Sequence, residues 1–296
     1  MFKVNAFVIG ASKTGTTSIH NFLKSHDNVC LPDKKEIYFF SNRTNDFSNY
    51  EAYHNQFNYK EEDLILEVCP AYDSIHIDKE IPKRIYEYNP EAKIVYIVRE
   101  PINRFKSIFK QALSSGHHFS DKNKHKFGMS LGLMSNDYSS AVKKYHSFIP
   151  SCRYYDVLTT YLNYFEEKQI LLLFYEDLKK DYYSYYNQLF KFLNIDIGDN
   201  FNNIRSNIGA DKFQKTKVTL FFERNRILRF LKRLMPQKFR AYLKRISSKP
   251  LNKRFDKSLL LDNDTKAYVY ESLKVNIQKI LDYGNKPKDF YGDFWL

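Results

Sequence analysis

Cysteine is scarce in this sequence, and its pattern excludes a disulfide framework. The 296 residues contain three cysteines, an odd number, and none belongs to a C-x-x-C pair. Cys30, Cys69 and Cys152 are therefore expected to be small buried residues of a protein from a reduced compartment. The histidines between residues 117 and 125 have no carboxylate or cysteine at a suitable spacing, so no metal site is predicted.

Long apolar runs are also missing. No stretch of eighteen apolar residues occurs, which argues against a transmembrane span. Residues 1–15 indicate a strand that enters a polar turn, rather than a charged segment followed by a long apolar stretch. No signal peptide is therefore expected, and the predicted location is the cytoplasm. With 43% hydrophobic and 17% aromatic residues and no internal repeat, the chain is expected to form one domain over residues 1–296.

Acidic residues are nearly missing from residues 212–249. This segment holds thirteen Lys or Arg residues and the single acid Glu223, a net charge of +12 out of the +13 of the whole chain. We expect a basic helical insertion over residues 212–250, because apolar residues follow helical spacing through residues 220–234. Two interpretations stay open: a helix packed on its own domain, or a surface for peripheral contact with an anionic membrane or an acidic glycan.

The most informative motif is the segment "FVIGASKTGTTSIHNFL", residues 7–23. An apolar strand end is followed by a turn rich in Gly, Ser and Thr and then by apolar residues at helical spacing. Unpaired amides and the helix dipole make such a helix N-terminus an anion site, and Gly15 lets the backbone approach a ligand. With Lys13 and the hydroxyls of residues 16–18, the expected guest is a phosphate or sulfate group.

The turn departs from the nucleotide-triphosphate motif G-x-x-x-x-G-K-[ST]. Gly10 and Gly15 have its spacing, but Thr16 stands where that motif has lysine, and Lys13 precedes the second glycine. No acid that could hold Mg²⁺ is evident after a strand. These departures count against a nucleotide-dependent kinase, which is the rival interpretation. The other alternative is a simple tight turn with a Ser/Thr helix cap.

Apolar runs and helical segments alternate along the chain. Runs at residues 64–68, 93–98 and 169–176 are separated by helical patterns near residues 78–88, 137–148 and 155–166, and a further helix is expected near 182–193. Residues 202–216 are expected to be loop, and helices to finish the chain. The pattern predicts an α/β fold: a P-loop-like parallel sheet flanked by helices, with a helical C-terminal extension.

A second cation follows a strand in "IVREPINRFKS", residues 97–107. Arg99 is placed at the carboxyl end of the strand at residues 93–98, and Ser107 lies about two turns into the next helix. A guanidinium offers a planar fork to a phosphate, Ser107 adds a hydroxyl, and Arg104 is a possible accessory. The alternative is an arginine paired with Glu100 or with a helix carboxylate.

The segments "KTGTTS" (13–18) and "VREPINRFKS" (98–107) resemble the 5′-phosphosulfate and 3′-phosphate loops of sulfotransferases that use 3′-phosphoadenosine 5′-phosphosulfate (PAPS). The segments "KKEIYFF" (34–40), "EVCPAY" (67–72), "LLLFYEDLKKD" (171–181) and "KDFYGDFW" (288–295) are similar to segments of carbohydrate sulfotransferases of the Golgi and bacterial type. The resemblance implies PAPS as donor, no metal, and a carbohydrate-type acceptor with a hydroxyl or amine group.

The resemblance also implies roles for single residues. Glu36 would be the general base, with a solvated ion pair to Lys34 or Lys35 as the alternative, and Lys13 would stabilise the leaving phosphate. Val68 stands where heparan-type members commonly have lysine, so a contact to an anionic sugar is missing. Glu67 either orders the site or makes a structural hydrogen bond. The implied donor-binding residues are Lys13, Thr14, Gly15, Thr16, Thr17, Ser18, Arg99, Ser107 and Lys212, with Arg205 and Lys215 as further candidates.

A basic module that binds nucleic acid or membrane is the last alternative. It would explain the charge of residues 212–249, but it would leave Lys13, Arg99 and Glu36 without a role. The expected partners are therefore a nucleotide donor and a saccharide acceptor, and no nucleic acid.

Overall fold

A computed structural model of the chain describes residues 2–24, 26–42, 46–115, 137–144, 147–196, 213–215, 248–250 and 259–296. The chain divides into two compact units. The first unit comprises Met1–Pro101, Ile149–Ile208 and Tyr270–Leu296, and the second comprises Ile102–Phe148 and Gly209–Val269. A single domain over residues 1–296, with 212–250 as an insertion, stays a prediction.

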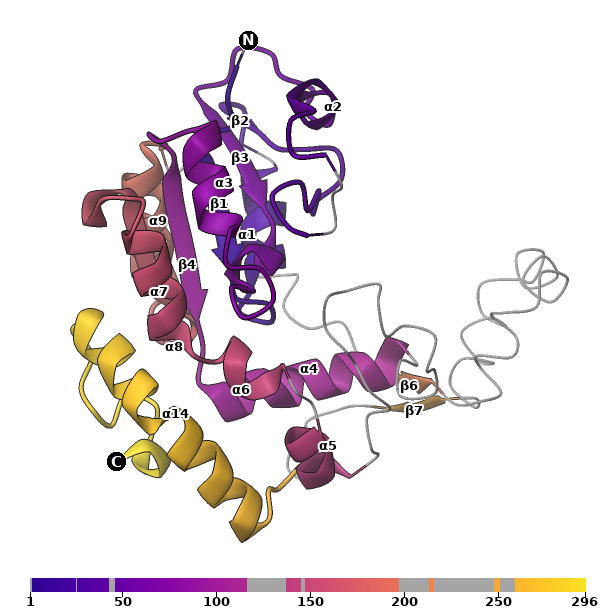
Figure 1. Ribbon diagram of the computed structural model, residues 1–296, viewed down its shortest axis with the longest axis vertical. Coiled ribbons are helices and arrows are strands. Elements are labelled where there is room, and N and C mark those ends of the chain that lie inside the picture. The colour runs from indigo at the N-terminus through magenta and orange to yellow at the C-terminus, as the bar shows by residue number, and fades with distance from the viewer. Residues whose placement is uncertain are drawn as a thin grey trace, which may run out of the picture. The chain divides into compact units, whose positions relative to one another are not determined.

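The first unit is built on one parallel sheet with the strand order β2-β3-β1-β4-β5, of which Figure 1 labels β1 to β4. Its strands are β1 Ala6–Gly10, β2 Val29–Cys30, β3 Leu64–Val68, β4 Lys93–Val98 and β5 Ile170–Phe174. In the centre, Ala6 of β1 lies opposite Leu66 of β3 and Lys93 of β4. The chain passes from β3 across β1 to β4, so the strand order switches beside β1, which is where open α/β sheets bind their ligands.

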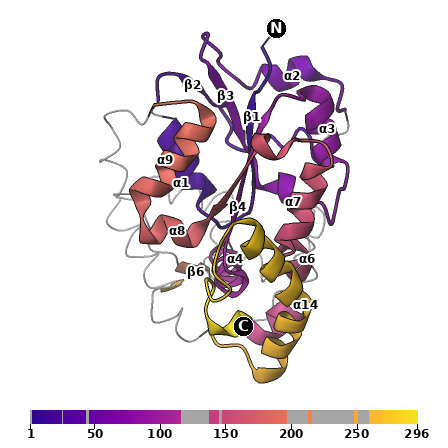
Figure 2. The ribbon, with the colours of Figure 1, turned by 90° about the vertical axis from the view of Figure 1, so that its left-hand side faces the viewer.

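Helices cover both faces of this sheet, as Figure 2 shows for α1 and α9 on one side and α3 and α7 on the other. The helices of this unit are α1 Thr16–Leu23, α2 Tyr50–His54, α3 Ile81–Tyr88, α7 Tyr154–Leu162, α8 Tyr175–Lys180 and α9 Tyr182–Leu193. Short 3₁₀ helices occur at Pro70–Asp73, Glu167–Gln169 and Asp293–Trp295.

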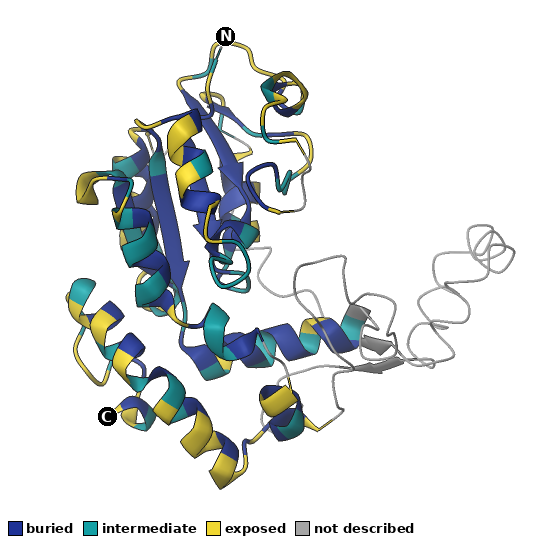
Figure 3. Cartoon of the chain, in the orientation of Figure 1, coloured by how far each residue is buried: buried dark blue, intermediate teal, exposed yellow. Residues whose placement is uncertain are grey.

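The pleat of the strands divides the core into two faces. Val8 and Ile97 pack with Phe22 of α1 and Phe190 of α9. On the opposite face, the ring of Phe7 contacts those of Phe40, Tyr72 and Tyr88. Both faces are therefore covered, and the central strands β1 and β3 are buried along their whole length, as Figure 3 shows. This explains why the strands have continuous apolar sequences rather than alternating ones.

The second unit contains helix α4 Pro101–Ser115, which begins at the last residue of the first unit, with α5 Tyr138–Lys144 and the start of α6 Phe148–Ser151. The ring of Phe105 packs against Phe109, Tyr138 and Phe148. Strands β6 Phe213–Lys215 and β7 Ser248–Pro250 pair antiparallel. The last long helix, α14 Asn263–Tyr283, has residues in both units.

The predicted fold class is confirmed: a parallel sheet flanked by helices, with a helix near the C-terminal end. Two details were wrong. The predicted strand at 169–176 ends at Phe174, because Tyr175 begins α8 and acids in its first turn favour a helix start. Residues 213–215 form a strand within the predicted loop at 202–216.

Other expectations depend on residues outside the described ranges. The predicted helix over residues 220–234 lies among them, and the two ends of 212–250 that are described are strands. All three cysteines are buried, as expected. Among the described helices, none is long and apolar enough to span a bilayer.

Candidate donor-binding site

The predicted anion turn joins β1 to α1 in the first unit. Gly15 has φ +91°, a left-handed conformation that residues with a side chain rarely adopt. A Cβ atom on Gly15 would lie 3.3 Å from Cε2 of Tyr175, so the ring of Tyr175 packs directly against the turn. Glycine is therefore required here both by the backbone and by the space.

The N-terminus of α1 presents free backbone donors. Within the described part of the chain, the amides of Gly15, Thr16 and Thr17 donate to no protein acceptor, whereas the Ser18 amide donates to the Gly15 carbonyl at 2.8 Å. No side chain caps this helix, and its first turn contains no acid. Three amides and the positive end of the helix dipole are thus available to an anion.

The hydroxyl side chains of the turn differ in exposure. Thr14 is fully buried and donates to the Ala11 carbonyl at 2.6 Å, so only its amide can donate to a ligand. Thr16 is also buried, while Ser18 is half-buried and Thr17 is exposed. The hydroxyls of Thr17 and Ser18 are therefore the ones that a bound anion could reach.

Arg99 lies beside this turn, as the position of β4 next to β1 requires. Its Nη1 donates to the Lys13 carbonyl at 2.9 Å, and its guanidinium lies 4.5 Å from the ring centre of Tyr175. The hydroxyl of Tyr154 donates to the Arg99 carbonyl at 2.7 Å. The structure thus brings together Lys13 and Arg99, the two cations that the sequence places after separate strands.

The alternative interpretation paired Arg99 with Glu100 or a helix carboxylate. The ion pairs found among the described residues include none with Arg99, and Glu100 instead accepts from the indole of Trp295 at 3.1 Å. The Nε of Arg99 is buried and has no hydrogen-bond partner among the described residues. A buried guanidinium nitrogen without a partner is costly unless a ligand accepts from it.

Glu36 lies in the segment after β2 and is linked to the anion turn through Lys35. The Nζ of Lys35 lies 3.1 Å from Oε1 of Glu36 and donates to Oγ1 of Thr17 at 3.1 Å. The hydroxyl of Tyr38 donates to the other carboxylate oxygen of Glu36. The ion pair that the alternative interpretation expected is therefore present, and it fixes Glu36 beside the N-terminus of α1.

Glu67, on β3, holds the backbone of the same segment. Its carboxylate is fully buried and accepts from the hydroxyls of Tyr53 at 2.8 Å and Tyr72 at 3.0 Å, and from the Ile37 amide at 3.3 Å. The Tyr72 hydroxyl also accepts a hydrogen bond from the Phe40 amide at 3.3 Å. Burial raises the pKa of Glu67 to about 7, against the opposing effect of these hydrogen bonds.

The raised pKa of Glu67 should make the free energy of unfolding depend on pH. Between about pH 4.5 and 7 the folded protein keeps a proton that the unfolded chain releases, so this group's contribution to the free energy of unfolding falls as the pH rises. Glu67→Gln removes the titration. The variant should therefore gain stability relative to wild type between pH 4.5 and 8, by up to about 3 kcal/mol at about 1.4 kcal/mol per pKa unit. Urea unfolding at several pH values measures this difference, and the exposed Glu61→Gln is the matched control. A difference between variant and wild type that does not change with pH would contradict the assignment.

The positions of the other predicted site residues relative to this turn are not determined, so their roles stay predictions. Ser107 is half-buried on α4, which belongs to the second unit, as does the buried Arg104. Lys212 and Arg205 lie outside the described residues, and Lys215 is described only as part of the backbone of β6. Within the described ranges, no cluster of three or more His, Cys, Asp or Glu side chains could hold a metal ion.

The sequence analysis used residues 171–181 for the family resemblance but assigned no site role to the residues that follow β5. The ring of Tyr175 contacts both the anion turn and Arg99, and Nζ of Lys179 lies 5.0 Å from the centre of the same ring. Glu176 accepts from the Glu100 amide at 3.3 Å, and burial raises its pKa. The rule that ligands meet the carboxyl ends of strands applies equally to β5 and could have found Tyr175.

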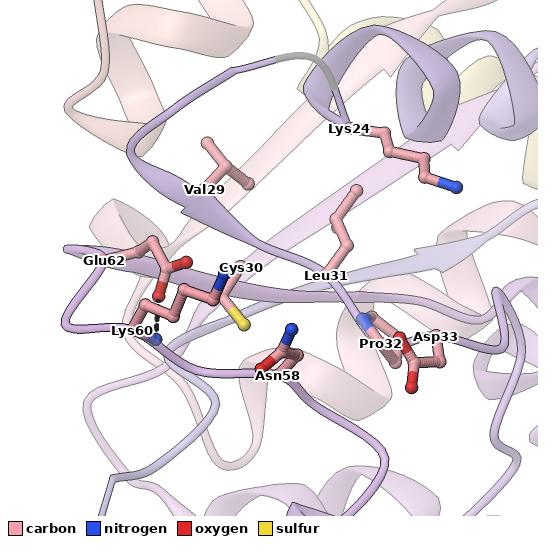
Figure 4. Close-up of a pocket in the computed structure, with 9 residues that line it drawn as sticks. All are labelled: Lys24, Val29, Cys30, Leu31, Pro32, Asp33, Asn58, Lys60 and Glu62. Atoms are coloured by element: carbon pink, nitrogen blue, oxygen red, sulfur yellow. Dashed lines mark hydrogen bonds between the residues drawn. The ribbon is translucent and has the colours of Figure 1, made fainter.

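A cavity of about 250 Å³ lies beside the edge strand β2 (Figure 4). None of the residues that line it belongs to the anion turn. Its walls carry charges of both signs, among them Lys24, Lys60, Asp33 and Glu62. Burial raises the pKa of Cys30 in this wall to about 11, which keeps its thiol protonated at neutral pH. The cavity therefore lacks the net positive charge that a polyanionic nucleotide requires.

A parallel sheet flanked by helices, with a glycine-containing turn between its central strand and the next helix, defines a P-loop-like α/β fold. The chain belongs to the sulfotransferase family. The family model described as "Sulfotransferase domain" matches residues 3–261. The family predicted from the motifs is thereby confirmed.

Individual relatives match over shorter stretches. The mouse protein named "Heparan sulfate glucosamine 3-O-sulfotransferase 5" is 36% identical over 124 residues, which are 41% of this chain and 34% of that protein. "Membrane-associated sulfotransferase kil1" of Dictyostelium discoideum is 31% identical over 34% of this chain and 21% of its own length. The matched part thus amounts to about a third or less of each of these relatives.

Structural similarity extends over more of the chain. The crystal structure of a sulfotransferase from Alicyclobacillus acidocaldarius aligns with 98% of this chain and 99% of its own, with a TM-score of 0.59 and 16% sequence identity. At this identity the similarity concerns the fold alone.

Proposed function

We propose that the protein transfers a sulfuryl group from PAPS to a hydroxyl group of a glycan. The observation that carries this proposal is the hydrogen bond from Arg99 to the Lys13 carbonyl, which joins the two cationic strand ends into one site. Family membership supports the reaction class, and the names of the heparan sulfate relatives support a glycan acceptor.

The residues present fit an anionic nucleotide. Three amides at the N-terminus of α1 have no protein acceptor among the described residues, and the buried Nε of Arg99 has no partner there. We assign the 5′-phosphosulfate to the anion turn and the 3′-phosphate to Arg99, and donor binding by Ser107 and Lys212 stays a prediction from the sequence. The ring of Tyr175 contacts both the turn and Arg99 and so supports the two parts of the site.

The proposed transfer is an in-line displacement at sulfur. The bond between sulfur and the bridging oxygen of the 5′-phosphate breaks while a bond from sulfur to the acceptor oxygen forms. Lys13 stabilises the negative charge that develops on the departing phosphate, and the amides of Gly15, Thr16 and Thr17 hold its non-bridging oxygens. Glu36 accepts the proton of the acceptor hydroxyl as its general base. No residue in this scheme requires a metal ion.

Two observations from the relatives and the sequence bear on the acceptor class. The relatives named for heparan sulfate favour a glycan hydroxyl, while Val68 stands where heparan-type members commonly have a lysine. An acidic glycan would also suit the basic residues 212–249. The predicted cytoplasmic location, the peripheral contact with an anionic membrane and the absence of a nucleic-acid partner stay predictions.

The test of the proposed function is a transfer assay. PAPS carrying radioactive sulfur is incubated with the protein and either heparan sulfate, a neutral polysaccharide or no acceptor, in the presence of a metal chelator. We expect labelled heparan sulfate and release of 3′,5′-ADP. A parallel assay measures hydrolysis of ATP with and without Mg²⁺. If neither glycan is labelled and ATP is hydrolysed only with Mg²⁺, the kinase interpretation is favoured instead.

A further inference from the structure

We infer that Lys35 is a positioning residue that holds the general base against the anion turn. The inference rests on the proposed function, because it assigns Lys35 a part in the same reaction. Neither the anion motif nor the arginine motif includes this lysine, which the sequence presents only as a counter-ion for Glu36.

Lys35 joins two segments that are separated in the sequence. Its Nζ makes contacts of 3.1 Å with Oγ1 of Thr17 and with Oε1 of Glu36, and its side chain is only 25% exposed. Thr17 lies in the first turn of α1, where the amides without protein acceptors are found. The ammonium group therefore bridges the exposed hydroxyl of the anion turn and the carboxylate assigned as base.

The backbone around Lys35 supports this geometry. The amide of Ile37, two residues after Lys35, donates to the buried carboxylate of Glu67, and the Tyr38 hydroxyl donates to Glu36. The hydrogen bond to Glu67 therefore attaches this segment to β3, and the hydrogen bond from Lys35 to Thr17 attaches it to α1. Lys34 offers a comparison, because it is exposed and makes no ion pair or hydrogen bond among the described residues.

The charges explain why a cation belongs at this place. A carboxylate base and a polyanionic donor repel each other when both occupy one site, and an ammonium group between them reduces that repulsion. The ammonium also has three hydrogens, of which Thr17 and Glu36 account for two. Without Lys35, Glu36 would lose its link to the turn and would keep only the hydrogen bond from the Tyr38 hydroxyl.

The experiment compares Lys35→Met with the matched control Lys34→Met and the conservative variant Lys35→Arg. Turnover is measured with PAPS and heparan sulfate, and binding of 3′,5′-ADP, which lacks the sulfuryl group, is measured by calorimetry. We expect Lys35→Met to lower kcat by about 10–150-fold, the range for losing a hydrogen bond to a charged group, with a much smaller loss of 3′,5′-ADP affinity from the removed positive charge. Lys34→Met should have no effect, and Lys35→Arg should retain most of the activity.

A double-mutant cycle distinguishes positioning from general stabilisation. If Lys35 acts through Glu36, then Lys35→Met should cause little further loss of kcat in a Glu36→Gln background. Additive losses, equal losses in both lysine variants, or loss of 3′,5′-ADP binding in Lys35→Met would each overturn the inference. A wild-type protein that neither binds 3′,5′-ADP nor transfers sulfate would instead overturn the proposed function and this inference with it.

Discussion

Replacing Glu36 with glutamine is expected to lower turnover by roughly 10²–10⁴-fold, the usual contribution of a positioned general base. Glutamine has nearly the same shape as glutamate, but it cannot take the proton of an acceptor hydroxyl. The carboxylate lies outside the set of groups assigned to the nucleotide phosphates, so 3′,5′-ADP should still bind the variant. The measurement pairs the kcat for heparan sulfate with calorimetric titration of 3′,5′-ADP.

The control for this variant is Glu61→Gln, an exposed acid in the loop before β3. It makes the same chemical change without touching the candidate site, and it should leave turnover unchanged. Wild-type turnover in Glu36→Gln would show that another group accepts the proton. A parallel loss of 3′,5′-ADP binding would show that Glu36 organises the donor site rather than the chemistry.

Arg99→Ala is expected to abolish most of the preference for 3′,5′-ADP over 5′-AMP. The guanidinium bonds to the Lys13 carbonyl and has a buried Nε without a partner among the described residues, so a phosphate would be its natural acceptor. A hydrogen bond to a charged group contributes about 1.5–3 kcal/mol, which corresponds to a loss of roughly 10–150-fold in affinity for 3′,5′-ADP. Affinity for 5′-AMP should change much less.

Arg153→Ala is the matched control for Arg99→Ala. Arg153 is exposed and pairs with Asp156 three residues later, so its removal changes the net charge equally without altering the site. Calorimetric titration of both variants with both nucleotides gives the comparison. Equal losses for 3′,5′-ADP and 5′-AMP in Arg99→Ala would mean that Arg99 supports the turn through Lys13 and does not recognise the 3′-phosphate.

The sequence allowed the central sheet to be predicted because its strands are continuous apolar runs. Val8 and Phe7 lie on opposite faces of the sheet, and both are buried. Strand β1 could therefore be found from its apolar run, without an alternation of apolar and polar residues. Strand β2, Val29–Cys30, was missed because two residues carry no periodicity. The start of α8 at Tyr175 was missed because apolar and aromatic residues continue from the strand into the helix.

The candidate site was predictable where it follows strand ends and unpredictable where it depends on long-range contacts. Lys13 and Arg99 follow neighbouring strands, so their proximity follows from the topology. The contact of Lys35 with Thr17 depends on the path of the segment after β2, which is fixed by the buried hydrogen bonds of Glu67. No local pattern encodes that path. The role of Glu36 came from the family resemblance, because an acid beside two lysines indicates only an ion pair.

The central claim, that the turn at Lys13 and the strand end at Arg99 together bind the donor nucleotide, is tested most directly by thermal unfolding of the wild-type protein with added nucleotides. The comparison uses 3′,5′-ADP, 5′-AMP, and ATP with Mg²⁺, with a chelator in the first two samples. The account predicts that 3′,5′-ADP raises the Tm without a divalent metal and does so more than either other nucleotide. An equal rise with 5′-AMP, or a rise only with ATP and Mg²⁺, would contradict it.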